Sequence, residues 1–265
     1  MQMMLKNKVA VIYGAAGAVG SAVSRAFARE GAKLFLTGVQ ESSVAALAKE
    51  IVSAGGSAEA AEVNALDDKA IDKHLQSVVD KTGQIDISFN AVGLRNTKLQ
   101  GVPLVELDLE EFARPIETYA NSYFLTARQA ARRMMVKEAG VIMTVTSTPS
   151  RTGIPLMGGV GPAMAAVEQL TRNLSAELAP KKIRVVGLRP TGMADSGTIK
   201  EVFGLHAKAW GIKWEQFQEI IAARSHGRRL STLTEMANVA AFMASDEASG
   251  MTGTILNLSL GALDD

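Results

Sequence analysis

The stretch that decides the fold is YGAAGAVG, residues 13–20. It follows the apolar run 9–13, precedes a helical pattern at 22–30, and is followed by a second apolar run at 33–37. Small residues let the backbone approach a pyrophosphate, and the start of a helix adds N–H donors and a positive dipole. The context therefore predicts a dinucleotide-binding turn. Glycines also serve tight strand-to-helix turns, so the loop alone leaves both interpretations open.

Apolar runs alternate with helical patterns along the rest of the chain. This rhythm predicts an α/β fold, a doubly wound parallel sheet of about seven strands with helices on both faces, in three layers. We expect one domain over residues 1–265 with an irregular, then helical insert at about 195–224. The predicted strands are 9–13, 33–37, 60–63, 85–90, 140–145, 183–188 and 254–258, and the predicted helices are 22–30, 43–54, 69–81, 109–136, 162–178 and 233–244.

Composition excludes several classes of function. Lys+Arg number 28 against Asp+Glu 27, so the chain has no basic footprint for nucleic acid and no polybasic arm for a membrane. Cysteine is absent, which excludes disulfides and thiolate nucleophiles, and the 3 histidines show no metal-ligand spacing, so no metal is expected. No signal peptide or membrane-spanning run is visible, and a cytoplasmic location is expected.

Several motifs resemble those of the short-chain dehydrogenase/reductase family, in the expected order over almost the whole length. Gly14 and Gly20 match the family's glycine motif, in which Tyr13 replaces Thr and Ala18 replaces the middle Gly. The segment FNAVG (89–93) is similar to the family's Asn-Asn-Ala-Gly, and VVGLRP (185–190) is similar to the strand before its Pro-Gly motif, with Thr191 for the Gly. The resemblance implies a Rossmann-like fold.

The resemblance also implies NAD or NADP as cofactor. The family selects between them with an acidic residue or an Arg after the second strand, but the segment TGVQ (37–40) carries neither, so the choice stays open and binding weaker than the family norm is expected. The cofactor-binding positions implied are Gly14, Ala16, Ala18, Val19, Gly20, Gly38, Val39, Glu62, Val63, Asn90, Ala91, Gly93 and Pro190.

The catalytic pattern of the family is broken in this chain. The family uses a Ser, a Tyr thirteen positions later, a Lys four beyond it, and an Asn on the preceding long helix. Ser147 matches the Ser, but the count then falls on Val160 and Met164, which cannot handle a proton. The Asn position falls on Tyr119. Two interpretations are open for Tyr119: a relocated acid, or a side chain that fills the vacated space.

The insert at 195–224 corresponds to the family's substrate-covering lid. Its long apolar and amphipathic side chains suit a hydrophobic small molecule as substrate. These side chains are Phe203, His206, Trp210, Trp214 and Phe217.

Three functions are consistent with these features. The first is an atypical NAD(P)-binding oxidoreductase that acts on a hydrophobic small molecule, with its acid supplied by Tyr119, water or the substrate. The second is a non-redox enzyme, of the cyclase, isomerase or lyase type, that uses the same pocket. The third is a non-catalytic cofactor-binding or partner subunit. The resemblance further implies a homotetramer or homodimer built on the helices at 109–136 and 162–178.

Overall fold

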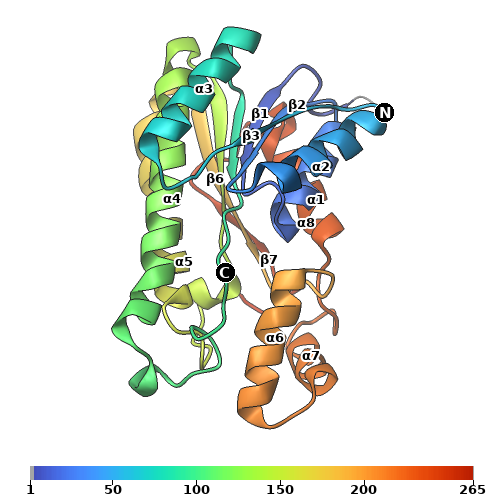
Figure 1. Cartoon of the computed structure of the whole chain (residues 1–265), viewed down its shortest axis with the longest axis vertical. Coiled ribbons are helices and arrows are strands. Elements are labelled where there is room, and N and C mark those ends of the chain that lie inside the picture. Colours follow the sequence, from blue (N-terminus) through green and yellow to red (C-terminus); the bar gives the residue numbers. More distant parts are fainter. Residues whose placement is uncertain (1–2, 265) are drawn as a thin grey trace.

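The protein forms one seven-stranded parallel sheet covered by helices on both faces (Figure 1). The computed structural model describes residues 3–264. Strands run in the order β3-β2-β1-β4-β5-β6-β7. The strands are β1 (Val9–Tyr13), β2 (Lys33–Gly38), β3 (Ser57–Glu62), β4 (Ile87–Asn90), β5 (Gly140–Val145), β6 (Ile183–Pro190) and β7 (Ile255–Leu258). The main helices are α1 (Ala18–Arg29), α2 (Glu41–Ser53), α3 (Asp68–Thr82), α4 (Leu109–Lys137), α5 (Val160–Leu178), α6 (Gly197–Trp210), α7 (Trp214–Ala223) and α8 (Leu233–Ala244).

The central strand β1 shows why both faces must be covered. All five of its residues are buried, and alternate side chains enter two different cores. Ala10 and Ile12 pack in the core beneath α1, α2 and α8, while Val9, Val11 and Tyr13 pack beneath α3 and α4. A strand that is apolar on both sides is typical of a parallel sheet between two helical layers.

The predicted doubly wound sheet and its seven strands are confirmed. Differences lie at element ends. Helix α1 begins at Ala18 rather than residue 22, because Gly17 is extended and the small residues after it enter the helix at once. Helix α5 begins at Val160 rather than residue 162, because Pro162 fits within a first turn, where a missing N–H costs nothing.

The insert contains two helices instead of an irregular stretch followed by one. Ser196 caps the start of α6 through its side chain, and Gly211 ends it in the left-handed region at φ 66°. Among residues 3–264, no helix combines the length and the apolar character that crossing a membrane requires.

The side on which strands are added to the sheet reverses between β1 and β4. Strands β2 and β3 extend the sheet on one side of β1, whereas β4 to β7 extend it on the other. Helices that follow β1 and β4 therefore leave the sheet on opposite faces, and a crevice opens at the carboxyl ends of these strands.

Candidate functional site

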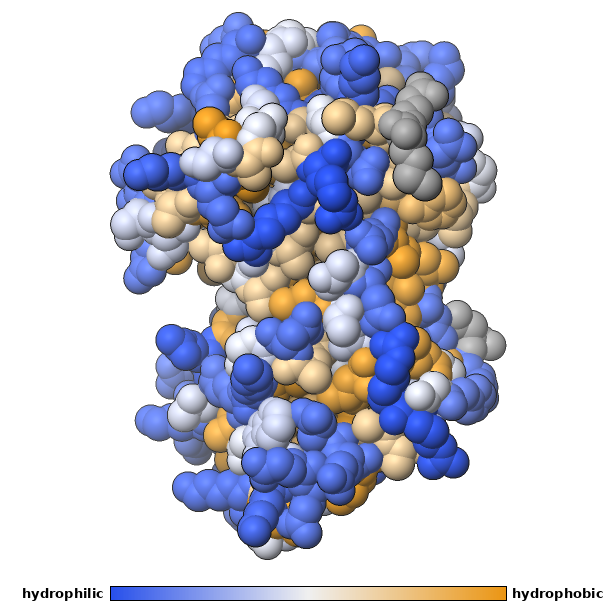
Figure 2. Space-filling view, turned by 90° about the vertical axis from the view of Figure 1, so that its right-hand side faces the viewer, coloured by the Kyte–Doolittle hydropathy of each residue, from blue (hydrophilic) through white to orange (hydrophobic). Residues whose placement is uncertain are grey.

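A cleft of 860 Å³ lies at the carboxyl ends of the strands and extends to helices α6 and α7. On the face drawn in Figure 2, the molecule narrows at mid-height, and hydrophobic residues gather there between hydrophilic residues above and below. We divide the cleft into two parts. The cofactor half is lined by Gly14, Ala16–Val19, Gly38–Gln40, Ser43, Val44 and Ala91–Gly93. The reaction half is lined by Tyr119, Ser147, Val160, Met164 and the lid residues of α6 and α7.

The glycine loop is shaped by two close backbone contacts. Gly14 lies at φ 65°, and a Cβ there would stand 2.7 Å from the carbonyl oxygen of Ala91. A Cβ on Gly20 would stand 2.3 Å from the carbonyl oxygen of Gly14. Both positions therefore require glycine, and Gly20 lies beneath the loop rather than on the cleft wall. Ala18 replaces the middle glycine without a clash, since it begins α1 and faces open space in the cleft.

The start of α1 provides donors for an anion. Gly17 precedes the helix without any side-chain cap, which leaves the first backbone N–H groups of α1 without a capping partner among the described side chains. Ala16, Ala18 and Val19 line the cleft at this point. A phosphate group fits this cradle, because the loop brings no side chain between the backbone and the cleft.

The far end of the cofactor half differs from the predicted list. Gly38 and Val39 line the cleft as predicted, together with Gln40 and Ser43, which the motif comparison omitted. Val63 is 4% exposed and packs in the core beneath α3, while Glu62 is exposed at the end of β3. Neither is among the residues that line the cleft. Strand β3 is the edge strand and lies beyond β2, whose carboxyl end reaches the cleft at Gly38.

Asn90 supports the cleft from behind. Its side chain is 2% exposed and donates a hydrogen bond to Thr126 Oγ1 at 3.0 Å, while its Oδ1 accepts from the backbone N–H of Val92 at 2.9 Å. These bonds shape the turn after β4. Ala91 and Gly93 reach the cleft wall on that turn, and Pro190 reaches it at the end of β6.

Ser147, Tyr119, Val160 and Met164 meet in the reaction half, although they come from two helices and one loop. Ser147 follows β5 in an extended conformation and is half-buried. Burial raises the pKa of the Tyr119 phenol to about 12, against the opposing effect of a backbone hydrogen bond with Leu94. Tyr119 is therefore neutral at pH 7 and a poor proton donor.

Tyr123 also lines the cleft, but its hydroxyl is used by the backbone. It donates to the carbonyl oxygen of Val145 at 2.8 Å and accepts from the Val145 N–H at 3.3 Å. Burial also raises the pKa of this phenol. The contacts assign Tyr123 to holding the end of β5, directly before the segment that carries Ser147.

The side chains of Val160 and Met164 are packed against a residue of another segment. They form a cluster with Leu99, which is fully buried and belongs to the loop between β4 and α4; we call these three residues the Leu99 cluster. The loop approaches so closely that a Cβ on Gly158 would stand 2.4 Å from the carbonyl oxygen of Leu99. Tyr119 packs against the same cluster. The wall beside Ser147 is thus a packed apolar surface.

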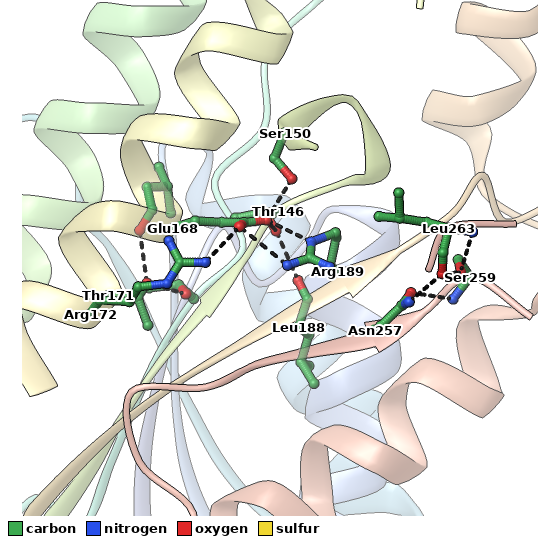
Figure 3. A network of polar contacts seen from close by, with 12 residues as sticks. Thr146, Ser150, Glu168, Thr171, Arg172, Leu188, Arg189, Asn257, Ser259 and Leu263 are labelled. Atoms are coloured by element: carbon green, nitrogen blue, oxygen red, sulfur yellow. Dashed lines mark hydrogen bonds and ion pairs between the residues drawn. The ribbon is translucent and has the colours of Figure 1, made fainter. Parts of the chain in front are cut away.

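A buried ion pair is hydrogen-bonded to Thr146 and Ser150, in the segment that also carries Ser147 (Figure 3). The guanidinium of Arg189 on β6 donates from Nε to Glu168 Oε1 at 2.7 Å, and these side chains are 1% and 2% exposed. The same carboxylate accepts from Ser150 Oγ at 2.5 Å and Thr146 Oγ1 at 3.3 Å, on both sides of Ser147. Burial acts to raise the pKa of Glu168, but Arg189, the Ser150 hydroxyl and Arg172 together hold it below its usual range. Sequence motifs did not indicate this network, because its members are distant in the chain.

The lid is an apolar cluster, and three of its five predicted side chains line the cleft. Phe203, His206 and Phe217 line it, and the rings of Phe203 and Phe217 meet edge-on at 5.2 Å. The two tryptophans are not among the lining residues. Trp210 is 38% exposed and packs on Phe217 from behind, and Trp214 donates from Nε1 to the carbonyl oxygen of Lys200 at 3.2 Å. They stabilise the lid instead of facing a ligand.

The fold and the cleft define the class of dinucleotide-binding α/β proteins, and comparison with known proteins specifies the family. A family model described as Enoyl-(Acyl carrier protein) reductase matches residues 14–262. The chain belongs to the short-chain dehydrogenase/reductase family of oxidoreductases.

Individual relatives are distant. The chain is 26% identical to the 7alpha-hydroxysteroid dehydrogenase of Escherichia coli (strain K12) over 99% of this chain and 97% of that protein. It is 31% identical to short chain aldehyde dehydrogenase 1 of Euphorbia lathyris over 96% of this chain and 86% of that one. Among solved structures, NAD+-bound xylitol dehydrogenase matches with a TM-score of 0.89 and 25% identity, covering 96% of this chain and 98% of that one.

Proposed function

We propose that this protein binds NAD or NADP and transfers hydride to or from a hydrophobic small molecule in an active site that lacks the family's Tyr and Lys. The observation that carries the proposal is the continuous cleft, which runs from the glycine loop to Ser147 and the apolar lid. Two similar structures support the choice of cofactor: NAD+-bound xylitol dehydrogenase and 7 alpha-hydroxysteroid dehydrogenase in complex with NADH. A bound nicotinamide would supply the hydride.

The residues of the chain have separate roles in this proposal. Backbone N–H groups at Ala18 and Val19 hold the pyrophosphate, and Gly38, Val39 and Gln40 border the adenosine, where no carboxylate excludes a 2′-phosphate. Ser147 donates a hydrogen bond to the substrate oxygen. We assign Val160 and Met164 to the Tyr and Lys positions. Tyr119 fills space beside them, and the proton is exchanged with water.

Titration with NADH and NADPH, followed by nucleotide fluorescence, tests cofactor binding. The matched variants are Ala18→Asp and Leu109→Asp. Both put a carboxylate in the first turn of a helix, where it favours folding, but only Ala18 lines the cleft, while Leu109 is 79% exposed on α4.

Ala18→Asp should weaken binding of both nucleotides about 10-fold or more, because its charge repels the pyrophosphate. Leu109→Asp should leave the dissociation constants unchanged. If wild-type protein gives no response to either nucleotide, or if both variants behave alike, the proposal is wrong.

A non-redox reaction in the same pocket is the second candidate. The packed apolar wall of the Leu99 cluster favours it, because such a wall can orient an organic substrate without a proton relay. The absorbance of the nicotinamide distinguishes the two candidate functions. Hydride transfer changes it during turnover of hydrophobic alcohols or ketones, whereas a lyase or isomerase would form product with the absorbance constant.

We also propose that copies of the chain assemble through α4 and α5. Helix α4 carries exposed apolar side chains, among them Phe124 at 43% and Val136 at 84%. Burying such groups between subunits is favourable. Light scattering on purified protein should report a dimer or a tetramer, and a monomer at micromolar concentration would contradict this assembly.

A further inference from the structure

His206 is a buried polar residue in the apolar lid. It lies on α6, its side chain lines the cleft, and it is 2% exposed. Phe217 packs against its ring at a centroid distance of 5.4 Å. A polar ring in such surroundings requires hydrogen-bond partners for its nitrogens.

One nitrogen is held by a short chain of amides. His206 Nε2 lies 3.1 Å from Gln100 Oε1, and Gln100 Nε2 donates to Asn96 Oδ1 at 2.7 Å. Asn96 Nδ2 in turn donates to the carbonyl oxygen of Leu94 at 3.3 Å. All three side chains are buried, with Asn96 and Gln100 each 4% exposed.

The last bond fixes the direction of the others. A carbonyl oxygen can only accept, so the nitrogen of Asn96 must face Leu94, and the Asn96 oxygen must face Gln100. Gln100 then presents its nitrogen to Asn96 and its oxygen to His206. That oxygen can only accept, so His206 donates from Nε2, and its neutral tautomer carries the proton there.

The second nitrogen, Nδ1, is left as an acceptor. Burial lowers the pKa of His206, so the ring stays neutral at pH 7 and keeps its lone pair. No hydrogen bond joins Nδ1 to any of residues 3–264, and Nδ1 is not among the fully enclosed polar atoms without a partner. It therefore has access to the space that His206 borders, which is the cleft.

We propose that His206 Nδ1 accepts a hydrogen bond from a hydroxyl group of the ligand, so the substrate of this cleft is a hydrophobic molecule that carries a hydroxyl at its lid end. The inference deepens the proposed function, since it uses the same cleft. Phe203 and Phe217 bind the apolar body, and His206 recognises the hydroxyl.

Two probes with the same naphthalene ring system test this proposal. 2-Naphthol carries a hydroxyl donor, whereas 2-methoxynaphthalene has none. Calorimetric titration of the full chain should show 2-naphthol binding about 10-fold more tightly, because the ether leaves Nδ1 unpaired. The preference should fall to less than 2-fold in His206→Phe and persist in His226→Phe, since His226 is not among the residues that line the cleft.

A spectroscopic measurement on wild-type protein removes any dependence on how the variant folds. With 15N-labelled histidine, the Nδ1 resonance of His206 should shift on addition of 2-naphthol and stay in place with 2-methoxynaphthalene. Equal affinities for the two probes, no binding of either, or a preference that survives in His206→Phe would overturn the proposal.

The nucleotide titration with Ala18→Asp is independent of these probes. If wild-type protein binds neither nucleotide but keeps the 2-naphthol preference, the oxidoreductase is refuted and the His206 site stands. If the protein binds nucleotide but shows no preference for 2-naphthol, the His206 site is refuted and the oxidoreductase stands.

Discussion

The two halves of the cleft lie at the same edge of one sheet, but they are built in opposite ways. In the cofactor half, backbone groups and small residues face the cleft. Glycine is required at positions 14 and 20, because an added Cβ would stand only 2.7 and 2.3 Å from backbone carbonyl oxygens. In the reaction half, side chains such as Val160 and Met164 make the surface, and Leu99 packs against it from behind. Backbone recognition depends on chain path and tolerates Tyr13 or Ala18 in the motif, whereas proton transfer depends on particular side chains, which can be replaced without loss of the fold.

The buried ion pair is the strongest link between the reaction half and the fold. Glu168→Ala removes one member of the buried pair with Arg189, so we expect the free energy of unfolding to fall by about 3–5 kcal/mol. Glu50→Ala is the matched control, because its pair with Arg25 is exposed to solvent and contributes far less to stability than a buried pair. Urea denaturation measures both. Similar losses for the two variants would mean that the buried pair has no special structural role.

Restoring a proton relay requires three changes rather than two. Val160→Tyr with Met164→Lys places larger side chains against Leu99, and this overpacking should cost about 1–3 kcal/mol. Adding Leu99→Ala makes room for the phenol. We expect the triple variant to reduce a ketone such as cyclohexanone about 100-fold faster than wild type, as measured by NADPH oxidation, because a positioned general acid contributes at least this much.

Leu99→Ala alone and the double variant are the controls for this prediction, and both should stay within about 10-fold of wild type. If the double variant already matches the triple one, the packing of Leu99 does not limit the reaction half.

Ser147 and Tyr119 should respond differently to the loss of one hydroxyl. Ser147→Ala should lower kcat/KM about 10-fold. This loss is smaller than that for a fully enclosed hydrogen-bond donor, because Ser147 is half-buried and water can replace its hydroxyl. Tyr119→Phe should change it less than about 2-fold, because the phenol fills space and retains its proton. Both rates are measured with the same substrate and nucleotide. A large loss in Tyr119→Phe would identify the phenol as the relocated acid.

The strands, their order of appearance and the glycine loop were predictable from the sequence, because continuous apolar runs and small residues are local signals. The predicted sites were less complete. Asn90, Gly20 and Val63 belong to the motifs, but they support the cleft from below or lie in the core. Gln40, Ser43 and Gln100 line the cleft without any motif to mark them.

By itself, the sequence determined the parallel sheet and the family resemblance, and it predicted apolar residues at the counted Tyr and Lys positions. It did so because each of these features is encoded by spacing along the chain. Only the tertiary structure decided what surrounds those positions. Leu99 packs against Val160 and Met164 from a loop about sixty residues earlier, Glu168 pairs with Arg189 across two elements, and Gln100 orients His206 on the lid. Such contacts join residues far apart in sequence, and they form only when the fold brings their elements to one edge of the sheet.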